Sequence, residues 1–390
     1  MSLTTASHLL AGTRRLRLGM VGGGLVSHWH HAGIRLSNRW DLIAGAFSSD
    51  PTRAVELGRQ WLLDESRIYT DYEEMARQEG RREDGIEAVA ICTPNHTHCA
   101  IAEVFLRAGI DVICDKPLAN SRVDGEALQR LQQETGLILA LTHPYIYHPM
   151  VRQAQTMIAE GAIGVLRQFV VEYAQEWAGI AAQTDSDQSE WRKDPAKAGR
   201  TSTTGDIGTH AFQLLEYVTG QTVEKLRADF HVCGPARDLE DTAFFNLTLE
   251  QGAPGTMWLS QVAAGQYCGL RFRLFGDGGS LSWDQEFPEQ LIYARFNEPQ
   301  QILLRGQGAG MLPAAEHMTR LPRGHGESLS DAWSNLYSDI AACIGHRRTG
   351  SGDVPPCAQH LPDVQVGVRG IRFIDAAADS HEAGGVWVSV

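Results

Sequence analysis

Residues 16–36 read LRLGMVGGGLVSHWHHAGIRL, an apolar run followed by three glycines and a helix-like stretch. The apolar run predicts a buried strand at Leu16–Val21, and the residues after the glycines predict a helix that continues to Leu36. A strand that passes through a glycine turn directly into a helix is the first half of a βαβ unit. The stretch therefore favours an α/β fold with a parallel sheet.

The same alternation of apolar runs and helix-like stretches continues to residue 141. Further strands are predicted at Asp41–Phe47, Ala88–Cys92, Asp111–Cys114 and Leu137–Leu141. Continuous apolar strands separated by helices indicate a sheet that is covered on both faces. Residues 14–145 are therefore predicted to form a doubly wound α/β domain.

After Pro149 the pattern changes, because one helix-like stretch is followed mainly by strand patterns. Strands are predicted around residues 169–173 and at Leu226–Val232, Thr242–Leu249, Gly255–Val262, Leu270–Phe275, Ser280–Trp283 and Gln290–Ala294. Residues 146–390 are predicted to form an α+β domain with a large, predominantly antiparallel sheet. A broad sheet with helices on one face leaves its other face to bury, which predicts a homo-oligomer.

The composition excludes several classes of protein. The length of 390 residues suits two or three domains. With 34 basic and 47 acidic residues, the net charge of −13 provides no electrostatic source for binding nucleic acid or an anionic membrane. No apolar run approaches the roughly 20 residues that span a bilayer. The seven cysteines are scattered without a CxxC pair, which indicates reduced thiols and a cytoplasmic protein.

The glycine turn has the spacing of a dinucleotide-binding motif, GxGxxG, with Ser27 at the third position. The first glycine makes the tight turn, and the second lets a pyrophosphate approach the N–H groups at the helix N-terminus. Its place directly after the first strand favours this function over an ordinary glycine-rich turn. Cofactor contacts are predicted at Gly22, Gly24, Leu25 and Val26.

The end of the second predicted strand bears on the choice between NAD and NADP. No carboxylate stands where an NAD-binding domain has its ribose ligand. Ser48, Ser49 and Arg53 are instead placed to bind a 2′-phosphate, which favours NADP, whereas Asp50 and a solvated Arg53 would favour NAD. Both cofactors stay open, with NADP preferred.

Two short segments carry residues suited to catalysis. Lys116 follows a strand, at the carboxyl end of the sheet where doubly wound folds bind ligands, although a surface turn is the commoner place for a lysine. Asp206 and His210 lie four residues apart at the start of a predicted helix that ends at Gly220, so both side chains project from one face. A carboxylate and an imidazole placed in this way form an acid/base pair. The alternatives are a helix-capping Asp206 and a structural His210.

Four motifs, taken in order and spacing, carry a likeness that covers nearly the whole chain. They are Gly22-Gly23-Gly24 with His30, Thr93-Pro94-Asn95-His96-Thr97-His98, Asp115-Lys116-Pro117, and Gly205-Asp206-Ile207-Gly208-Thr209-His210. The chain thus resembles the glucose-fructose oxidoreductase, inositol dehydrogenase and rhizopine catabolism (Gfo/Idh/MocA) family of nicotinamide-dependent oxidoreductases. The resemblance implies a Rossmann domain, then an open-faced sheet used in dimers or tetramers, and a sugar, sugar derivative or inositol as substrate.

The resemblance also implies residue roles. Lys116 would contact the nicotinamide region and the substrate hydroxyl, Asp206 the substrate and the histidine, and His210 would exchange the proton. Further cofactor contacts are predicted at Thr93, Pro94, Asn95, His98, Asp115, Lys116 and Pro117. Substrate contacts are predicted at Lys116, Tyr145, Trp177, Arg192, Asp206 and His210. His96 and His98 are not predicted to form a metal site, since further ligands are lacking nearby.

Two alternatives differ in function. A non-catalytic nicotinamide-binding regulator would need no proton-transfer histidine, so Lys116, Asp206 and His210 favour the enzyme. A dehydrogenase of a non-sugar substrate such as a dihydrodiol would have a more apolar pocket. Arg192, Tyr145 and the acid/base pair suit a substrate with several hydroxyl groups.

Overall fold

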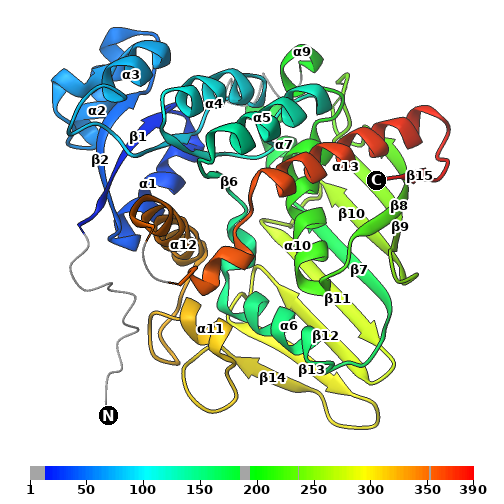
Figure 1. Ribbon diagram of the computed structural model, residues 1–390. Coiled ribbons are helices and arrows are strands. Elements are labelled where there is room, and N and C mark those ends of the chain that lie inside the picture. The colour runs from blue at the N-terminus through cyan, green and yellow to red at the C-terminus, as the bar shows by residue number, and fades with distance from the viewer. Residues whose placement is uncertain (1–13, 185–193, 236, 351–352) are drawn as a thin grey trace. The chain divides into compact units, whose positions relative to one another are not determined.

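The computed structural model describes residues 14–184, 194–235, 237–350 and 353–390. These residues form two compact units, each assembled from separate stretches of the chain (Figure 1). The first unit comprises the residues up to Ala119, Val123–Pro144 and Leu329–Val368. The second unit comprises Asn120–Arg122, Tyr145–Ser328 and Arg369–Val390.

The first unit contains a six-stranded sheet in the order β3-β2-β1-β4-β5-β6, in which all neighbours are parallel. Its strands are β1 (Leu16–Val21), β2 (Trp40–Ala46), β3 (Ile68–Tyr69), β4 (Ala88–Ile91), β5 (Asp111–Cys114) and β6 (Leu139–Leu141). Strands β1 and β4 are hydrogen-bonded neighbours, with Val21 opposite Ile91. The strand order reverses between them, and doubly wound sheets bind their ligands at such a point.

Helices pack around this sheet, and every residue of β4, β5 and β6 is buried. The helices that lie wholly or mostly in the unit are α1 (Leu25–Ser37), α2 (Pro51–Gln60), α3 (Tyr72–Glu79), α4 (His98–Arg107), α5 (Arg122–Thr135) and α12 (Leu329–Thr349), with 3₁₀ turns η1 (Glu65–Arg67), η2 (Asn95–Thr97) and η6 (Pro356–His360). Helix α2 begins at Pro51 because the Asp50 side chain accepts the N–H of Arg53. Helix α1 ends at Asn38, whose left-handed φ of 54° stops the helix.

Helix α12 belongs to the first unit although it follows the second sheet in the sequence. Figure 1 shows it in brown beside α1, with which it is in contact. The Tyr337 hydroxyl lies 2.7 Å from Nδ1 of His30, and Nε1 of Trp40 donates to the Tyr337 carbonyl at 2.9 Å. At the end of the helix, Arg347 forms an ion pair of 2.7 Å with the buried Asp111. The predicted domain of residues 14–145 does not include this helix, because no local feature of a sequence reveals contacts between such distant segments.

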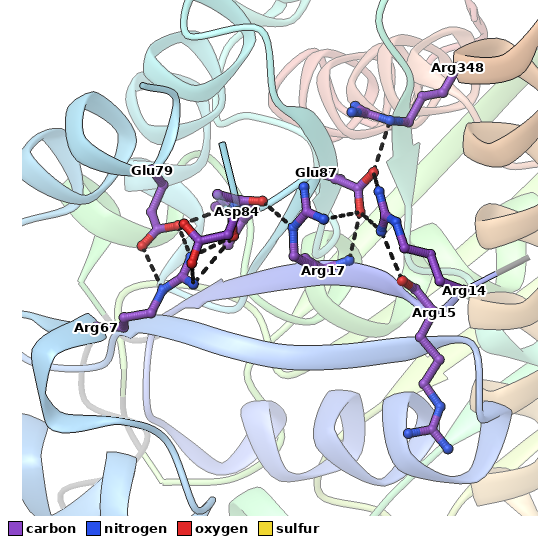
Figure 2. Close-up of polar contacts among 10 residues, drawn as sticks. Arg14, Arg15, Arg17, Arg67, Glu79, Asp84, Glu87 and Arg348 are labelled. Atoms are coloured by element: carbon purple, nitrogen blue, oxygen red, sulfur yellow. Dashed lines mark hydrogen bonds and ion pairs between the residues drawn. The ribbon is translucent and has the colours of Figure 1, made fainter. Parts of the chain in front are cut away.

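The buried carboxylate of Glu87, directly before β4, lies among arginines from three parts of the first unit (Figure 2). Arg14 donates to both carboxylate oxygens, at 2.5 and 2.8 Å, and Arg348 of α12 forms an ion pair with it at 3.0 Å. The backbone N–H of Arg17 donates at 3.0 Å. Burial acts to raise the pKa of Glu87, but these donors and charges outweigh burial and hold the pKa below its ordinary value. The ionised carboxylate thus joins β1, β4 and α12.

The second unit contains a nine-stranded sheet in the order β14-β13-β12-β11-β7-β10-β9-β8-β15. Its strands are β7 (Leu166–Ala174), β8 (Val223–His231), β9 (Thr242–Leu249), β10 (Pro254–Ser260), β11 (Gly269–Gly276), β12 (Gly279–Asp284), β13 (Gln290–Arg295), β14 (Gln301–Leu304) and β15 (Val388–Ser389). Strands β7 and β10 pair in parallel, and the other neighbours pair antiparallel. Along β9, Phe245 and Leu247 are buried whereas Phe244 and Asn246 are exposed, so one face of the sheet is covered more deeply than the other.

Helices cover the buried face of this sheet. The helical elements that lie wholly or mostly in the unit are the 3₁₀ turn η3 (Pro144–Tyr147), α6 (Pro149–Ala159), α7 (Trp177–Thr184), α9 (Pro195–Ala198), the π-helical turn η5 (Thr204–Gly208), α10 (Thr209–Thr219), α11 (Pro313–Met318) and α13 (Val364–Glu382). Helices α6 and α10 contact the strands directly. Phe373 of α13 stacks on Phe212 of α10 at 4.5 Å and lies 5.6 Å from Phe245 of the sheet. Truncating a buried aromatic side chain of this kind costs about 3–5 kcal/mol, so these contacts fix α10 firmly.

The predicted fold class is confirmed: a doubly wound parallel sheet is followed by a large, predominantly antiparallel sheet. The predicted strands Asp111–Cys114 and Thr242–Leu249 have the same bounds as β5 and β9. Within the described ranges, no helix is both long enough and apolar enough to cross a membrane.

Candidate functional site

The glycine turn after β1 is fixed by its neighbours in the first unit. Gly22 has a φ of 102°, and a Cβ atom on it would lie 2.6 Å from the carbonyl oxygen of Cys92, which follows β4. Both the backbone conformation and the close approach therefore require glycine. The N–H of Gly22 also donates to the Ala46 carbonyl of β2 at 2.9 Å. The turn lies where the ends of three neighbouring strands meet.

Gly24, at the start of α1, differs from Gly22 because it faces open space. No protein atom lies within 4 Å of the position that its Cβ would take. The first turn of α1 has no side-chain cap and no acidic residue, so its N–H groups and the positive end of the helix dipole are available to an anion. Ser27 is fully buried and its hydroxyl donates to the Gly24 carbonyl at 2.6 Å, so a small residue replaces the third glycine. The turn fits the pyrophosphate of a dinucleotide.

The residues after β2 are arranged around the start of α2. The Asp50 carboxylate accepts the N–H of Arg53 at 3.1 Å, and the Ser48 hydroxyl accepts the N–H of Asp50 at 3.1 Å. Ser49 and Arg53 are exposed. Asp50 thus serves as a helix cap, and Arg53 lies in the first turn of α2.

The loop after β4 is tied to the loop after β5 by His98. Its Nδ1 atom lies 2.8 Å from the Pro117 carbonyl, and its Nε2 atom lies 2.8 Å from the Thr93 carbonyl. The Thr93 hydroxyl accepts from Thr97 at 2.7 Å, so the loop that contains Pro94 and Asn95 is held from both sides. Burial lowers the pKa of His98. This fully buried ring therefore acts as a connection between two predicted cofactor loops.

Lys116 and Asp115 follow β5, beside residues that follow β6. The Asp115 carboxylate accepts from the Thr142 hydroxyl at 2.5 Å, and the peptide bond between Lys116 and Pro117 is cis. His143 is buried, and burial together with the nearby charge of Lys116 lowers its pKa to about 3. A neutral imidazole therefore lies close to the lysine that sequence reasoning selected. His143 was not among the predicted site residues.

In the second unit, Asp206 lies within the π-helical turn η5, and His210 lies in the first turn of α10. As predicted, both lie at the start of a helix that is closed by Gly220, whose φ is 64°. Single π-helical turns are rare and occur frequently at functional sites. Both side chains are half-buried, so each has a protected side and an accessible side.

The buried Glu240 caps this helical segment. Its carboxylate accepts the backbone N–H groups of Ser202 and Thr204, at 2.9 and 2.8 Å. Asp206 is therefore not the cap of the helix, which was the structural alternative for this residue. Its carboxylate instead accepts a hydrogen bond of 2.7 Å from the side-chain amide of Gln261.

Two tyrosines beside His210 begin a row of hydrogen-bonded side chains formed by Tyr145, Tyr173, Gln175 and Trp177. We refer to these four residues as the phenol row. The Tyr145 ring stands edge-on to the His210 ring, with 4.9 Å between centroids. The two tyrosine hydroxyls are 2.5 Å apart; Gln175 donates to Tyr173 at 3.3 Å and accepts from the Trp177 indole at 3.0 Å.

The protonation states of Tyr145 and Tyr173 bear on which side chain near His210 can accept a proton. Burial raises the pKa of both Tyr145 and Tyr173 well above the ordinary value, so both phenols stay protonated near neutral pH. The Cys268 sulfur lies 3.6 and 3.5 Å from the two hydroxyl oxygens. Among these groups, an imidazole is the one whose ordinary titration includes neutral pH. An imidazole in this position can exchange a proton with a bound hydroxyl group.

Comparison with known proteins identifies the family. A model described as "Oxidoreductase family, NAD-binding Rossmann fold" matches residues 16–143, and one described as "GFO/IDH/MocA C-terminal domain" matches residues 151–282. An uncharacterized oxidoreductase of Bacillus subtilis, YfiI, is 34% identical over 390 residues, which cover 96% of this chain and 97% of that protein. The chain belongs to the GFO/IDH/MocA family of oxidoreductases. The predicted family, the oxidoreductase class and a nicotinamide-binding Rossmann domain are confirmed.

Solved structures of this family share the whole architecture. An oxidoreductase from Sinorhizobium meliloti is 40% identical, with 96% of this chain and 100% of that chain covered and a TM-score of 0.86. An inositol dehydrogenase homolog from Azotobacter vinelandii, complexed with NADH and myo-inositol, is 34% identical, with 97% and 98% covered and a TM-score of 0.89. The likeness therefore includes both units of this GFO/IDH/MocA protein.

The predicted site residues divide between the two units of this family member. The predicted cofactor contacts, from Gly22 to Pro117, all follow strands of the parallel sheet or begin the helices after them. Tyr145, Trp177, Asp206 and His210 lie in the second unit. Arg192 lies outside the described residues. Among the residues that are described, no group of three or more His, Cys, Asp and Glu side chains is arranged to hold a metal ion.

Sequence reasoning missed the residues that support these side chains: His143, Tyr173, Glu240, Gln261 and Cys268. Tyr173 is the last residue of the strand predicted around residues 169–173. Gln261 lies at the end of the predicted strand Gly255–Val262, and Glu240 precedes the predicted strand Thr242–Leu249, so their positions near strand ends were the only signal. Their partners depend on the pairing of strands, which a single sequence does not reveal.

Proposed function

We propose that the chain transfers a hydride between a nicotinamide dinucleotide and a secondary alcohol or ketone of a sugar, a sugar derivative or an inositol. The observation that carries this proposal is the placement of His210 against the phenol row, on the same helical segment as an Asp206 held by Gln261. The Azotobacter vinelandii homolog in complex with NADH and myo-inositol supports the same class of substrate.

The proposed mechanism assigns one role to each residue. When bound, the nicotinamide supplies the hydride acceptor or donor at its C4 atom. His210 takes the proton of the substrate hydroxyl during oxidation and returns it during reduction. Asp206 favours the protonated imidazole by its negative charge, and Lys116 stabilises the developing alkoxide by its positive charge. The neutral phenols of Tyr145 and Tyr173 bind substrate hydroxyl groups without changing protonation.

The cofactor is held in this proposal by the first unit. The N–H groups of Gly24, Leu25 and Val26 bind the pyrophosphate at the start of α1. We favour NADP over NAD, because Asp50 is engaged as a helix cap and the Arg53 side chain is exposed beside Ser48 and Ser49. A guanidinium and two hydroxyls suit a 2′-phosphate, whereas a ribose diol requires a free carboxylate.

The cysteines bear on the cellular compartment of the protein, and the nine-stranded sheet bears on its oligomeric state. All seven cysteines, which lie within the described ranges, are free, and this supports a protein of the reducing cytoplasm. The less covered face of the nine-stranded sheet exposes Phe244 and Ile302, and this supports a homodimer or homotetramer that buries it. Size measurement in solution tests the assembly.

The first test is thermal stability in NAD, NADH, NADP and NADPH. Saturation at about 100 times the Kd adds roughly 2.7 kcal/mol of stability, so the preferred pair is readily identified. Turnover with that pair is then measured on a panel of inositols and pyranosides, for the wild type and for His210→Ala. We expect turnover with at least one polyol and a loss of about 10²–10⁴-fold in the variant. Stabilisation by nucleotide without turnover on any polyol would instead identify a regulator or a different substrate.

A further inference from the structure

The side chain of Gln261 links two residues of the segment that carries Asp206 and His210. Gln261 follows β10 and is fully buried. Its Nε2 atom donates to Oδ2 of Asp206 at 2.7 Å, and its Oε1 atom accepts from the Thr203 hydroxyl at 3.0 Å. The sheet and the π-helical turn are thus joined by one amide.

The chemistry of the partners fixes the orientation of this amide. An ionised carboxylate only accepts hydrogen bonds, so the NH₂ group must face Asp206. The oxygen then faces the Thr203 hydroxyl, whose proton can be donated to it at 3.0 Å or to the Glu240 carbonyl at 3.3 Å. The reversed orientation would place two acceptors against each other at Asp206, and each group therefore has a partner in one arrangement only.

The backbone of Gln261 is anchored as well. Its N–H donates to the Asp241 carbonyl at 2.9 Å, and its carbonyl accepts the N–H of Ala178 in α7 at 3.0 Å. A buried residue held at both backbone groups and at both ends of its side chain has little freedom to move. It presents its NH₂ group to Asp206 from a fixed point.

Asp206 also lies close to Tyr145, which in turn contacts His210. The charge of Asp206 acts on the Tyr145 phenol, and the Tyr145 ring lies against the His210 imidazole. A half-buried aspartate without a fixed donor has several staggered side-chain conformations available. The donor from Gln261 restricts this choice.

We propose that Gln261 is a positioning residue that acts through Asp206, with Thr203 as its support. The inference rests on the proposed catalytic role of Asp206 and His210. Gln261 does not touch the reacting atoms in this proposal. It holds the carboxylate in the single orientation in which that carboxylate serves His210.

The main test uses Gln261→Met, which retains the length of the side chain and removes both hydrogen-bonding groups. We expect kcat to fall roughly 10- to 100-fold, as for other small displacements of a catalytic group, while the Kd of the nicotinamide cofactor stays unchanged. Thr203→Val should show a smaller loss of the same kind, and Thr203→Ser should restore activity because it keeps the hydroxyl. Gln153→Met is the matched control: Gln153 is a buried glutamine of the same unit whose side chain binds Leu312 and Gly310 instead. It should retain wild-type kcat per folded molecule.

A double-mutant cycle separates positioning from a general loss of structure. If Gln261 acts through Asp206, then Gln261→Met added to Asp206→Asn should change kcat by less than about twofold beyond Asp206→Asn alone. Losses that multiply in the double variant would overturn the inference, since Gln261 would then act independently of the carboxylate.

A crystal structure of Gln261→Met provides a readout that needs no substrate. We expect the Asp206 carboxylate to leave its wild-type position while the π-helical turn remains intact. An unmoved carboxylate would refute the inference even if the enzyme is active. Absence of turnover in the wild type would count against the proposed function, and the crystal structure would still decide the role of Gln261.

Discussion

The imidazole of His98 lies 2.8 Å from the carbonyl oxygen of Pro117, the residue that follows Lys116. The other ring nitrogen is equally close to the Thr93 carbonyl. One buried side chain therefore sets the distance between the loops after β4 and β5, both of which carry predicted cofactor contacts.

His98→Ala should weaken cofactor binding and lower turnover together. The substitution removes the connection between the two loops and leaves the carbonyl that accepts the ring N–H without its donor, which costs about 1–3 kcal/mol; we expect roughly a tenfold or greater rise in the cofactor Kd. Calorimetric titration with the preferred nucleotide measures it. His96→Ala, two residues away and exposed, is the control and should bind as the wild type does. Equal effects of the two substitutions would show that the connection does not matter for binding.

Arg53→Ala should weaken NADP by roughly tenfold or more and leave NAD almost unchanged, because only NADP carries the 2′-phosphate that an arginine binds. Arg59 lies on the same helix, is also exposed, and pairs with Glu65 at 2.6 Å. Arg59→Ala is therefore a control for loss of charge on α2. The four Kd values for each variant are compared. A parallel loss for NAD and NADP in Arg53→Ala would remove Arg53 from the discrimination.

Gly24→Ala should impair nucleotide binding more than stability, whereas Gly22→Ala should lower the stability of the fold itself. The new methyl group at Gly24 meets no protein atom within 4 Å, so stability should fall by less than about 1 kcal/mol, while the methyl group occupies the predicted pyrophosphate position and abolishes nucleotide-induced stabilisation. At Gly22 the positive φ and the Cys92 carbonyl at 2.6 Å should lower stability itself. Thermal midpoints with and without nucleotide distinguish the two outcomes. Normal nucleotide binding by Gly24→Ala would place the pyrophosphate elsewhere.

Stability should fall as the pH drops below about 6.5. Burial lowers the pKa of His30 and of His148 to about 4 and, with the charge of Lys116, that of His143 to about 3. In the unfolded chain these groups bind protons below about pH 6.5, whereas the native state does not, so each contributes stability that is complete above that pH and is lost at about 1.4 kcal/mol per pH unit below it.

Denaturant unfolding between about pH 7.5 and pH 5.5 measures this slope. His148→Gln should reduce the slope by one proton relative to the wild type. A slope that is the same in the variant and in the wild type would mean that His148 is protonated in the native state.

The sequence contains enough information to place much of the fold and to select the residues of a candidate cofactor site. The first strand, the glycine turn and the helix after it are local features, and local periodicity also set the bounds of β5 and β9. Lys116, Asp206 and His210 could be selected because each lies at the end of a strand or the start of a helix. In each case the decisive signal lies within a few residues of the feature that it predicts.

The remaining features depend on contacts between distant segments. Glu240 caps the segment of Asp206 from beyond β8, and Gln261 reaches the same segment from the end of β10. The π-helical turn has no marker in the composition of Thr204–Gly208. Nothing in the local sequence of α12 names its partner, and only the folded chain shows that Tyr337 meets His30.

Because α12 belongs to the first unit, that unit cannot be completed until nearly all of the chain has been translated. At about 5–20 residues per second, roughly 10–40 s separate the synthesis of β6 from that of α12. During this interval His30 and Trp40 lack Tyr337, and Asp111 lacks Arg347. Strands β7 to β14 emerge before those partners exist. The unit that is begun first is thus completed late, after nearly all of the second sheet has been translated.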